Sequence, residues 1–309
     1  SILGNRVLRK EDPKFLTTGG KYIEDLNDEP LFAGALHVTY VRSTVAHAKI
    51  TNIDLSECKN SPGVVAVFTA DDLGLEEEPS AFNPMAKRSH LAKGKVRWVG
   101  ELVAAVVTQR PDQGEDAIEK AIVEYETLEP LIDLEQAMVS KTLLYEECGT
   151  NIVMGTVEMG MPDNTGDEIF KDCEVVVKGR FMNQRVAPCP LEARGSAAIW
   201  INGRLTQWIS TQHAQGVRNE VVKANKIDAE KVRIITPDVG GGFGAKISAY
   251  SEELLLGNIA KRVGKAVRWR ETRSESMISL GHGRAQLQYV TIGGTKAGRV
   301  KAYQLNAIQ

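Results

Sequence analysis

The sequence predicts an α+β fold built in two parts. Its 309 residues are enough for about two domains. Strand-like and helix-like patterns occur in both halves without strict alternation, and a polar, glycine-containing stretch near residues 140–167 separates the halves. We therefore expect one domain at residues 1–135, a linker at 136–173 and a second domain at 174–309.

The first part contains four short runs that are rich in apolar and β-branched residues. They predict strands at Leu31–Val41, Ala48–Leu55, Gly63–Phe68 and Leu102–Val107. Two helices are expected, a short one that begins near Thr69 and a longer one at Asp112–Tyr125. In the longer helix, apolar residues recur at helical spacing and Asp112 is a candidate N-cap. Residues 74–95 lack a regular pattern, which predicts a long loop.

The second part shows the same two kinds of pattern. Its predicted strands are Glu174–Phe181, Val232–Ile235 and Ala266–Arg270, with hairpins at Ser196–Trp200/Leu205–Ser210 and Leu287–Ile292/Arg299–Ile308. Its predicted helices are Gln215–Asn225 and Ser251–Val263. The last strand is still part of a sheet when the sequence reaches Gln309, so we expect a truncated or naturally split subunit.

Composition and charge argue against several classes of function. The net charge of −2 gives no basic surface for nucleic acid or an anionic membrane. No apolar run of about 18 residues could span a bilayer. The first residues do not resemble a signal peptide, so a cytoplasmic location is expected. The four cysteines are widely spaced, which argues against a zinc or iron–sulfur site on this chain.

The most informative segment is the glycine loop, Gly240–Lys246. It lies between a predicted strand and a predicted helix, which would place it at a helix N-terminus suited to an anion. Gly240, Gly242 and Ala245 fit the dinucleotide fingerprint G-x-G-x-x-A, but Pro237 and Asp238 separate them from the strand. A tight structural turn is a second interpretation. Four glycines exceed what a turn needs, so a cofactor loop of another kind is favoured.

The glycine loop resembles the GGGFGxK loop of the xanthine dehydrogenase/aldehyde oxidase family of molybdenum hydroxylases. Ser210-Thr211-Gln212 is similar to the S-T-Q segment of the same large subunits. Five further segments resemble family motifs and extend the likeness over most of the chain: Arg42–Ile50, Pro62–Val67, Val99–Ala104, Asn183–Arg185 with Pro190–Gly195, and Gly281–Gln286. The last of these is similar to the aerobic carbon monoxide dehydrogenase-like branch.

The resemblance implies an a/b hammerhead-type domain followed by the first, incomplete part of a mixed α/β molybdopterin-binding domain. It also implies that five residues bind the cofactor: Gln212, Gly241, Gly242, Phe243 and Gly244. Of these, Gln212 and Phe243 would lie next to the ligands of the molybdenum. Ile247 would line the substrate pocket. It stands where purine-oxidising members carry a glutamate, so xanthine is disfavoured as a substrate.

By the same resemblance, the complete enzyme oxidises an aldehyde, an N-heterocycle or a similar carbon centre, with water as the oxygen source. Its cofactor would be molybdopterin. The resemblance does not decide whether the pterin carries a cytosine dinucleotide. Electrons would pass to 2Fe-2S clusters and FAD on partner subunits.

The catalytic glutamate of the family lies further toward the C-terminus, so no catalytic residue is expected in this chain. The isolated chain should be inactive, and a second molybdopterin-binding chain or a C-terminal part should complete it. An NAD-binding Rossmann-type protein and a non-catalytic assembly subunit remain as alternatives.

Overall fold

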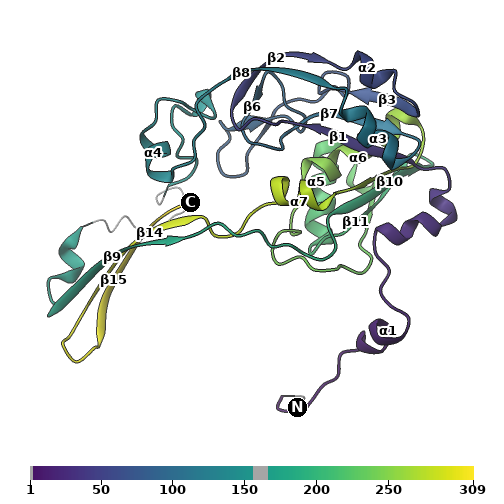
Figure 1. The fold of residues 1–309 in the computed structure, drawn as a ribbon. Coiled ribbons are helices and arrows are strands. Elements are labelled where there is room, and N and C mark those ends of the chain that lie inside the picture. Colours follow the sequence, from purple (N-terminus) through teal and green to yellow (C-terminus); the bar gives the residue numbers. More distant parts are fainter. Residues whose placement is uncertain (1–2, 156–165) are drawn as a thin grey trace.

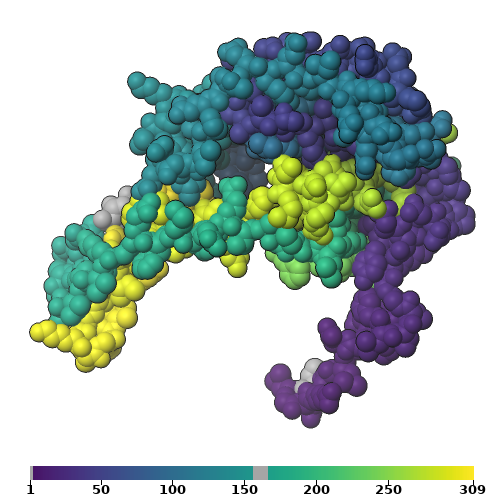
Figure 2. Space-filling view, in the orientation of Figure 1, coloured from purple at the N-terminus to yellow at the C-terminus, as the bar shows by residue number. Residues whose placement is uncertain are grey.

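The computed structural model describes residues 3–155 and 166–309. Figure 1 shows a mixed α/β body, from which an N-terminal arm and a three-stranded sheet extend in different directions. In the space-filling view, the far part of the three-stranded sheet and the first part of the N-terminal arm project from the body (Figure 2). No helix in the described ranges is long and apolar enough to cross a membrane. The part of the predicted linker at residues 156–165 lies outside the described residues.

The body is organised around a seven-stranded sheet with the order β12-β11-β10-β13-β1-β7-β3. In chain order its strands are β1 (Leu36–Arg42), β3 (Val64–Phe68), β7 (Leu102–Thr108), β10 (Gly195–Ile201), β11 (Arg204–Ile209), β12 (Val232–Ile235) and β13 (Val267–Arg270). The central pair, β1 and β13, is parallel, with Leu36 opposite Val267. Strands from both halves of the sequence therefore form one continuous sheet.

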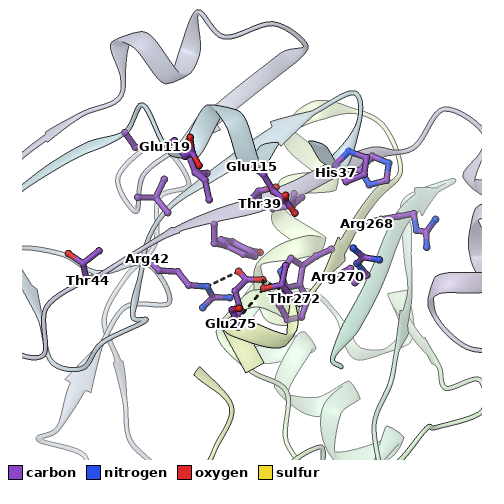
Figure 3. A pocket seen from close by; sticks show the side chains of 18 of the residues that line it. His37, Thr39, Arg42, Thr44, Glu115, Glu119, Arg268, Arg270, Thr272 and Glu275 are labelled. Carbon is purple, nitrogen blue, oxygen red and sulfur yellow. Dashed lines mark hydrogen bonds and ion pairs between the residues drawn. The ribbon is translucent and has the colours of Figure 1, made fainter. Parts of the chain in front are cut away.

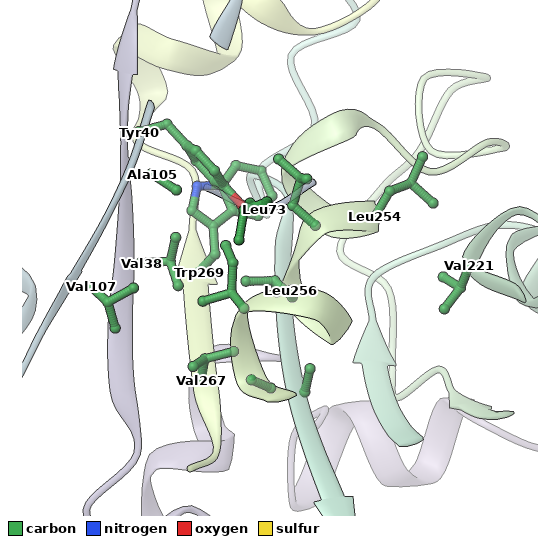
Figure 4. Close-up of a cluster of buried hydrophobic side chains, with 14 of the residues drawn as sticks. Val38, Tyr40, Leu73, Ala105, Val107, Val221, Leu254, Leu256, Val267 and Trp269 are labelled. Atoms are coloured by element: carbon green, nitrogen blue, oxygen red, sulfur yellow. The ribbon is translucent and has the colours of Figure 1, made fainter. Parts of the chain in front are cut away.

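Two helices, α5 (Ala214–Asn225) and α6 (Ser251–Val263), pack on one face of this sheet. The resulting core combines side chains from both halves, such as Tyr40 and Val107 with Leu256 and Trp269 (Figure 4). Burial of apolar side chains on this scale is the main stabilising contribution to the fold. The two halves therefore share one core.

The opposite face of β7 is covered by α2 (Ser56–Lys59), α3 (Pro111–Ile118) and a small sheet. That small sheet has the order β6-β2-β8 and comprises β2 (Ala48–Asp54), β6 (Lys95–Val96) and β8 (Ile122–Thr127). Because both of its faces are covered, every residue of β7 is buried. Gly114 lets α3 approach the sheet closely, since a Cβ there would lie 2.2 Å from Oγ1 of Thr39.

The N-terminal arm contains α1 (Asp12–Thr17) and the 3₁₀ turns η1 (Glu24–Asp28) and η2 (Pro30–Phe32). The Phe32 ring packs edge-on against Trp208 with their centroids 5.0 Å apart. The Lys21 backbone N–H donates to Asp238 Oδ2 at 2.8 Å, and the Asp238 N–H donates back to the Lys21 carbonyl at 3.0 Å. The arm is thereby tied to the residues just before the glycine loop.

The projecting sheet has the order β15-β14-β9. It comprises β9 (Val175–Asn183), β14 (Gln286–Gly294) and β15 (Val300–Ile308), with large apolar side chains such as Phe181 and Met182 exposed. The elements not yet named are β4 (Glu78–Pro79), β5 (Lys87–Arg88), α4 (Leu134–Val139), η3 (Glu146–Cys148), η4 (Asp167–Phe170), η5 (Ala229–Lys231) and α7 (Arg273–Ser279).

The predicted α+β class is confirmed, and so is the hairpin at Asn202–Gly203, where both residues have positive φ (49° and 75°). The short helix near Thr69 was a wrong prediction. The chain turns there because the Thr69 hydroxyl and backbone N–H both donate to Asp72 Oδ2, at 2.7 and 2.8 Å. Helix α4 was not predicted, although Asp133 caps it by accepting from the Gln136 N–H at 2.9 Å.

The predicted helix Asp112–Tyr125 is also corrected. Helix α3 ends at Ile118, and the remainder forms β8. Along β8, Val123 and Tyr125 face the core whereas Ile122 and Glu124 are exposed, which is the alternation of a strand. The N-cap is Arg110 rather than Asp112, because the Gln113 side chain accepts from the Arg110 N–H at 3.0 Å.

A buried ionic network connects the two halves. The Arg194 side chain has no exposed area, and its guanidinium contacts Glu271 at 2.5 Å and Glu252 at 3.1 Å. Glu252 also accepts from Arg42 of β1 at 3.0 Å. Burial opposes ionisation of Glu252, but the charges of Arg194 and Arg42 outweigh it and lower its pKa to about 2. One carboxylate of α6 therefore holds cations from both halves.

Glu253, the next residue of α6, has a raised pKa where that of Glu252 is lowered, so its effect should make the protein less stable as the pH rises. Burial raises its pKa to about 8 from 4.5, against the opposing effect of Arg194. Its contribution to stability is therefore complete below pH 4.5 and is lost as the pH rises toward 8. We expect Glu253→Gln to be more stable than wild type at pH 8 by ~1 kcal/mol or more. Urea unfolding between pH 4.5 and 8 measures this.

The control for this prediction is Glu124→Gln, which alters an exposed glutamate of β8. It should follow the wild-type pH dependence. The prediction would be contradicted if the free energy of unfolding changed with pH equally in Glu253→Gln and in wild type.

Candidate functional site

Two loops of interest leave the sheet at the same edge. Strands β11 and β12 are parallel neighbours, with Trp208 opposite Ile235. The segments that follow them, Ser210–Gln212 and the glycine loop, therefore emerge side by side at the carboxyl ends of the strands. In α/β sheets this edge is the usual place for a ligand.

Hydrogen bonds fix the orientation of the Gln212 side chain. Its Oε1 accepts from the backbone N–H of Gly244 at 3.0 Å and from that of Lys246 at 3.3 Å. The Gln212 N–H in turn donates to the Lys246 carbonyl at 2.8 Å. With the carbonyl end engaged, the Nε2 amino group donates to no atom of the described residues and is exposed. Gln212 therefore presents a fixed, neutral donor at the surface.

The glycines have specific steric roles. Gly241 and Gly244 adopt φ values of 101° and 89°, which favour glycine strongly. At Gly242, an added Cβ would lie 2.3 Å from Oε1 of Gln212, and at Gly240 it would lie 2.5 Å from Cβ of Glu192. The loop can therefore pack against Gln212 and Glu192 only with glycine at these two positions.

Phe243 has an unusual conformation for an aromatic residue. Its φ is 53°, in the left-handed region, and 74% of its surface is exposed. Such backbone strain costs about 1–3 kcal/mol and tends to occur at functional positions. The ring is part of none of the buried apolar clusters of the described residues.

A buried ion pair lies beneath the loop. Lys246 is 2% exposed, and its Nζ donates to Glu192 Oε2 at 2.9 Å. The same carboxylate oxygen accepts from the Ser210 hydroxyl at 2.6 Å and from the Gly240 N–H at 2.8 Å. The motif at Pro190–Gly195 drew attention to this segment in the sequence, but sequence reasoning assigned no role to Glu192.

The glycine loop does not lie at a helix N-terminus, contrary to expectation. Helix α6 begins only at Ser251, and its first turn is capped internally, with the Tyr250 N–H donating to the Glu253 side chain at 2.7 Å. The dinucleotide-binding interpretation needs the glycines at the start of the helix and loses its structural basis. Ile247, which follows the loop, is half-exposed.

Two cavities of the described chain lie away from this loop. One, of about 860 Å³, is bounded by β1, β13, α3 and α7, with Arg42 directed at Glu275 along one wall (Figure 3). The other, of about 1030 Å³, lies near the base of the projecting sheet. The residues that line these two cavities do not include those of the glycine loop. Within the loop, Phe243 and Gly244 are exposed, whereas Gly242, Ala245 and Lys246 are buried.

Comparison with known proteins places these features in a wider context. Residues 17–129 match the family model of the aldehyde oxidase and xanthine dehydrogenase a/b hammerhead domain. Residues 144–309 match that of the molybdopterin cofactor-binding domain.

Among individual proteins, the chain is 33% identical to the nicotine 6-hydroxylase large subunit of Paenarthrobacter nicotinovorans, over 100% of this chain and 38% of that protein. It is 30% identical to the nicotinate dehydrogenase large molybdopterin subunit of Eubacterium barkeri, over 98% and 69% of the two chains. The solved CO dehydrogenase of Oligotropha carboxidovorans is similar in fold, with a TM-score of 0.86 and 31% identity over 98% of this chain and 39% of that one. The chain thus spans well under half of the first and third of these proteins.

Proposed function

Because this chain belongs to the xanthine dehydrogenase/aldehyde oxidase family, we propose that it forms the front part of the molybdopterin-binding subunit of a molybdenum hydroxylase. The complete enzyme would oxidise an aldehyde, an N-heterocycle or a similar carbon centre, with water as the oxygen source. The observation that carries this proposal is the amide of Gln212, which two loop N–H groups hold with its donor end free.

The residues present suit molybdopterin, which supplies the redox chemistry when bound. Gln212 offers a neutral hydrogen-bond donor, which can hold an oxygen atom in place without adding charge beside a redox centre. Gly244 is exposed and Gly241 is partly exposed, so a ring system could come close to their bare backbone, while Gly242 is buried against Gln212 and would hold that side chain toward the same group. The exposed Phe243 would pack against the same group and exclude water from it. Ile247, just beyond the loop, would border the substrate.

The remaining parts of the enzyme would lie on other polypeptide segments. We propose that a second molybdopterin-binding chain or a C-terminal part supplies the catalytic carboxylate, and that partner subunits carry the 2Fe-2S clusters and FAD. A cytoplasmic location is part of the proposal, and the four free cysteines fit a reducing compartment.

We also propose that the sequence divides at residues 1–135, 136–173 and 174–309, as two units that meet in one shared sheet. The non-catalytic alternative, an assembly subunit, would have no need for a free Gln212 donor beside a strained, exposed aromatic ring. Whether the purified native complex contains stoichiometric molybdenum decides between the enzyme and the assembly subunit.

Substrate preference tests the proposed pocket. Ile247 offers no hydrogen-bond partner to the polar edge of a purine, and an apolar pocket discriminates against an added polar group by about 100-fold. We expect the complex to oxidise an aldehyde or an apolar heterocycle at least ~100-fold better than xanthine, as kcat/KM. The substitution Ile247→Glu should narrow that ratio. Comparable kcat/KM values for xanthine and the best aldehyde in the unmodified complex would be contrary to this assignment.

A further inference from the structure

One carboxylate fastens two segments that are distant from it in the sequence. Glu192 lies just before β10, and its Oε2 accepts hydrogen bonds from the Ser210 hydroxyl, the Gly240 N–H and the Lys246 ammonium, at 2.6, 2.8 and 2.9 Å. Ser210 begins the segment that carries Gln212. Gly240 and Lys246 are the first and last residues of the glycine loop. Glu192 therefore contacts both ends of the loop and the start of its neighbour.

The Lys246 ammonium has its full set of partners. Besides Glu192 Oε2, its Nζ donates to the Glu192 carbonyl at 2.9 Å and to the Ser210 hydroxyl at 3.0 Å. Its side chain has no exposed area. A buried ammonium is strongly destabilising without a counter-charge, so Lys246 cannot move away from Glu192 without a large cost. The side chain is also too deep to meet a substrate or a cofactor directly.

The backbone of the same lysine holds Gln212. The Lys246 N–H donates to Oε1 of Gln212 at 3.3 Å, while the Lys246 carbonyl accepts from the Gln212 N–H and from the Thr211 hydroxyl, both at 2.8 Å. The Lys246 side chain is held by Glu192, and the Lys246 backbone holds the Gln212 amide. Fixing the side chain therefore also fixes the position of Gln212. Phe243 lies between the two fastened ends of the loop.

We propose that Glu192 and Lys246 are positioning residues, which form an ionic clamp that keeps Gln212 and Phe243 in the geometry the cofactor requires. This inference rests on the proposed function. A loop with four glycines loses much conformational entropy when it is ordered, and Phe243 adds backbone strain. In the part of the chain that the structure describes, none of the buried apolar clusters includes residues of the loop that could offset these costs. The buried Lys246–Glu192 ion pair stabilises the loop from the interior of the protein, so Phe243 and Gly244 can remain exposed.

Hydrogen exchange in the full chain tests the clamp without the cofactor. Mass spectrometry of peptides spanning residues 238–246 would report the protection of the Gly240 and Gly244 amides. Lys246→Met removes the hydrogen bonds that the ammonium donates to Glu192 and Ser210. Exchange in these peptides should therefore become about 10–100-fold faster relative to exchange in peptides of β7. Glu192→Gln should also speed exchange in these peptides, because it leaves the buried Lys246 ammonium without a counter-charge.

The matched control is Lys95→Met, which also removes a buried ammonium paired with a glutamate, at 2.7 Å from Glu146. It should lower the Tm but leave exchange in peptides 238–246 at the wild-type rate. In the assembled complex, Lys246→Met should reduce the molybdenum content and Lys95→Met should not.

If Lys246→Met and Glu192→Gln lower the Tm while loop exchange relative to β7 stays at the wild-type value, the clamp is wrong. Should Lys246→Met fail to fold, the exchange measured for Glu192→Gln decides the question alone. These outcomes are distinct from failure of the proposed function, which would appear as an absence of molybdenum in the unmodified complex.

Discussion

Replacement of Arg194 by methionine is expected to destabilise the protein by about 3–5 kcal/mol. The substitution leaves the Glu271 carboxylate, which lies 2.5 Å from the guanidinium, buried without a counter-charge. It also leaves Arg42 as the one cationic side chain that pairs with Glu252 among residues 3–155 and 166–309. The Tyr250 ring, 4.0 Å from the guanidinium carbon, loses its packing partner as well. Urea unfolding at pH 7 measures the loss.

The pH dependence of this loss identifies its cause. The lowered pKa of Glu252 stabilises the fold above pH 4.5, and that contribution disappears as the pH falls toward 2. The difference between wild type and Arg194→Met should therefore be largest near neutral pH and shrink below pH 4.5. The control is Arg180→Met, which removes an exposed pair with Glu135 and should cost under ~1 kcal/mol. A loss that does not vary with pH would indicate packing rather than charge.

Truncation of either of the two exposed site residues should lower activity strongly while leaving the fold intact. Phe243 is 74% exposed, so Phe243→Ala should change the stability of the chain by no more than about 0.5 kcal/mol. In the assembled complex it should lower molybdenum content and activity by at least ~10-fold, because the ring would shield the cofactor. Gln212→Ala should lower activity by about 10–100-fold, as losses beside a metal typically do.

The measurements for this pair are molybdenum per protomer, turnover and Tm, made on the same preparations. Phe82→Ala is a suitable control, since Phe82 is 69% exposed in a loop of the first half. It should match wild type in all three measurements. Normal molybdenum content and turnover in both Phe243→Ala and Gln212→Ala would remove these residues from the site.

The sequence predicted elements well where one periodicity dominated. Helix α6 was predicted with its observed limits, because its apolar stripe is long and Gly264, at φ 64°, ends it. The run after Asp112 was misread because Ala117, Ile118, Ala121 and Ile122 fit a helix as well as a helix followed by a strand. Only packing of Val123 and Tyr125 on the core separates the two.

In the candidate site, too, the features set by neighbouring residues could be predicted from the sequence, and those set by distant residues could not. Gln212 and the glycines could be predicted because their motifs are contiguous in the sequence. Glu192 could not, since its ion-pair partner Lys246 is 54 residues away and nothing local shows that they meet. The exposure of Phe243 was equally hidden, because it follows from the conformation of the loop and an aromatic residue is more often expected in a core.

The parallel pairing of β1 with β13 has a consequence for the time course of synthesis. Strand β1 cannot pair with its second neighbour until β13 has been synthesised. Leu36 and its partner Val267 are 231 residues apart in the sequence. At about 5–20 residues per second, a ribosome needs roughly 12–46 s to make that stretch. During this interval one edge of β1 is open to incorrect pairing. The nascent chain thus has a period of vulnerability that ends only when β13 emerges, and chaperone protection matters most within it.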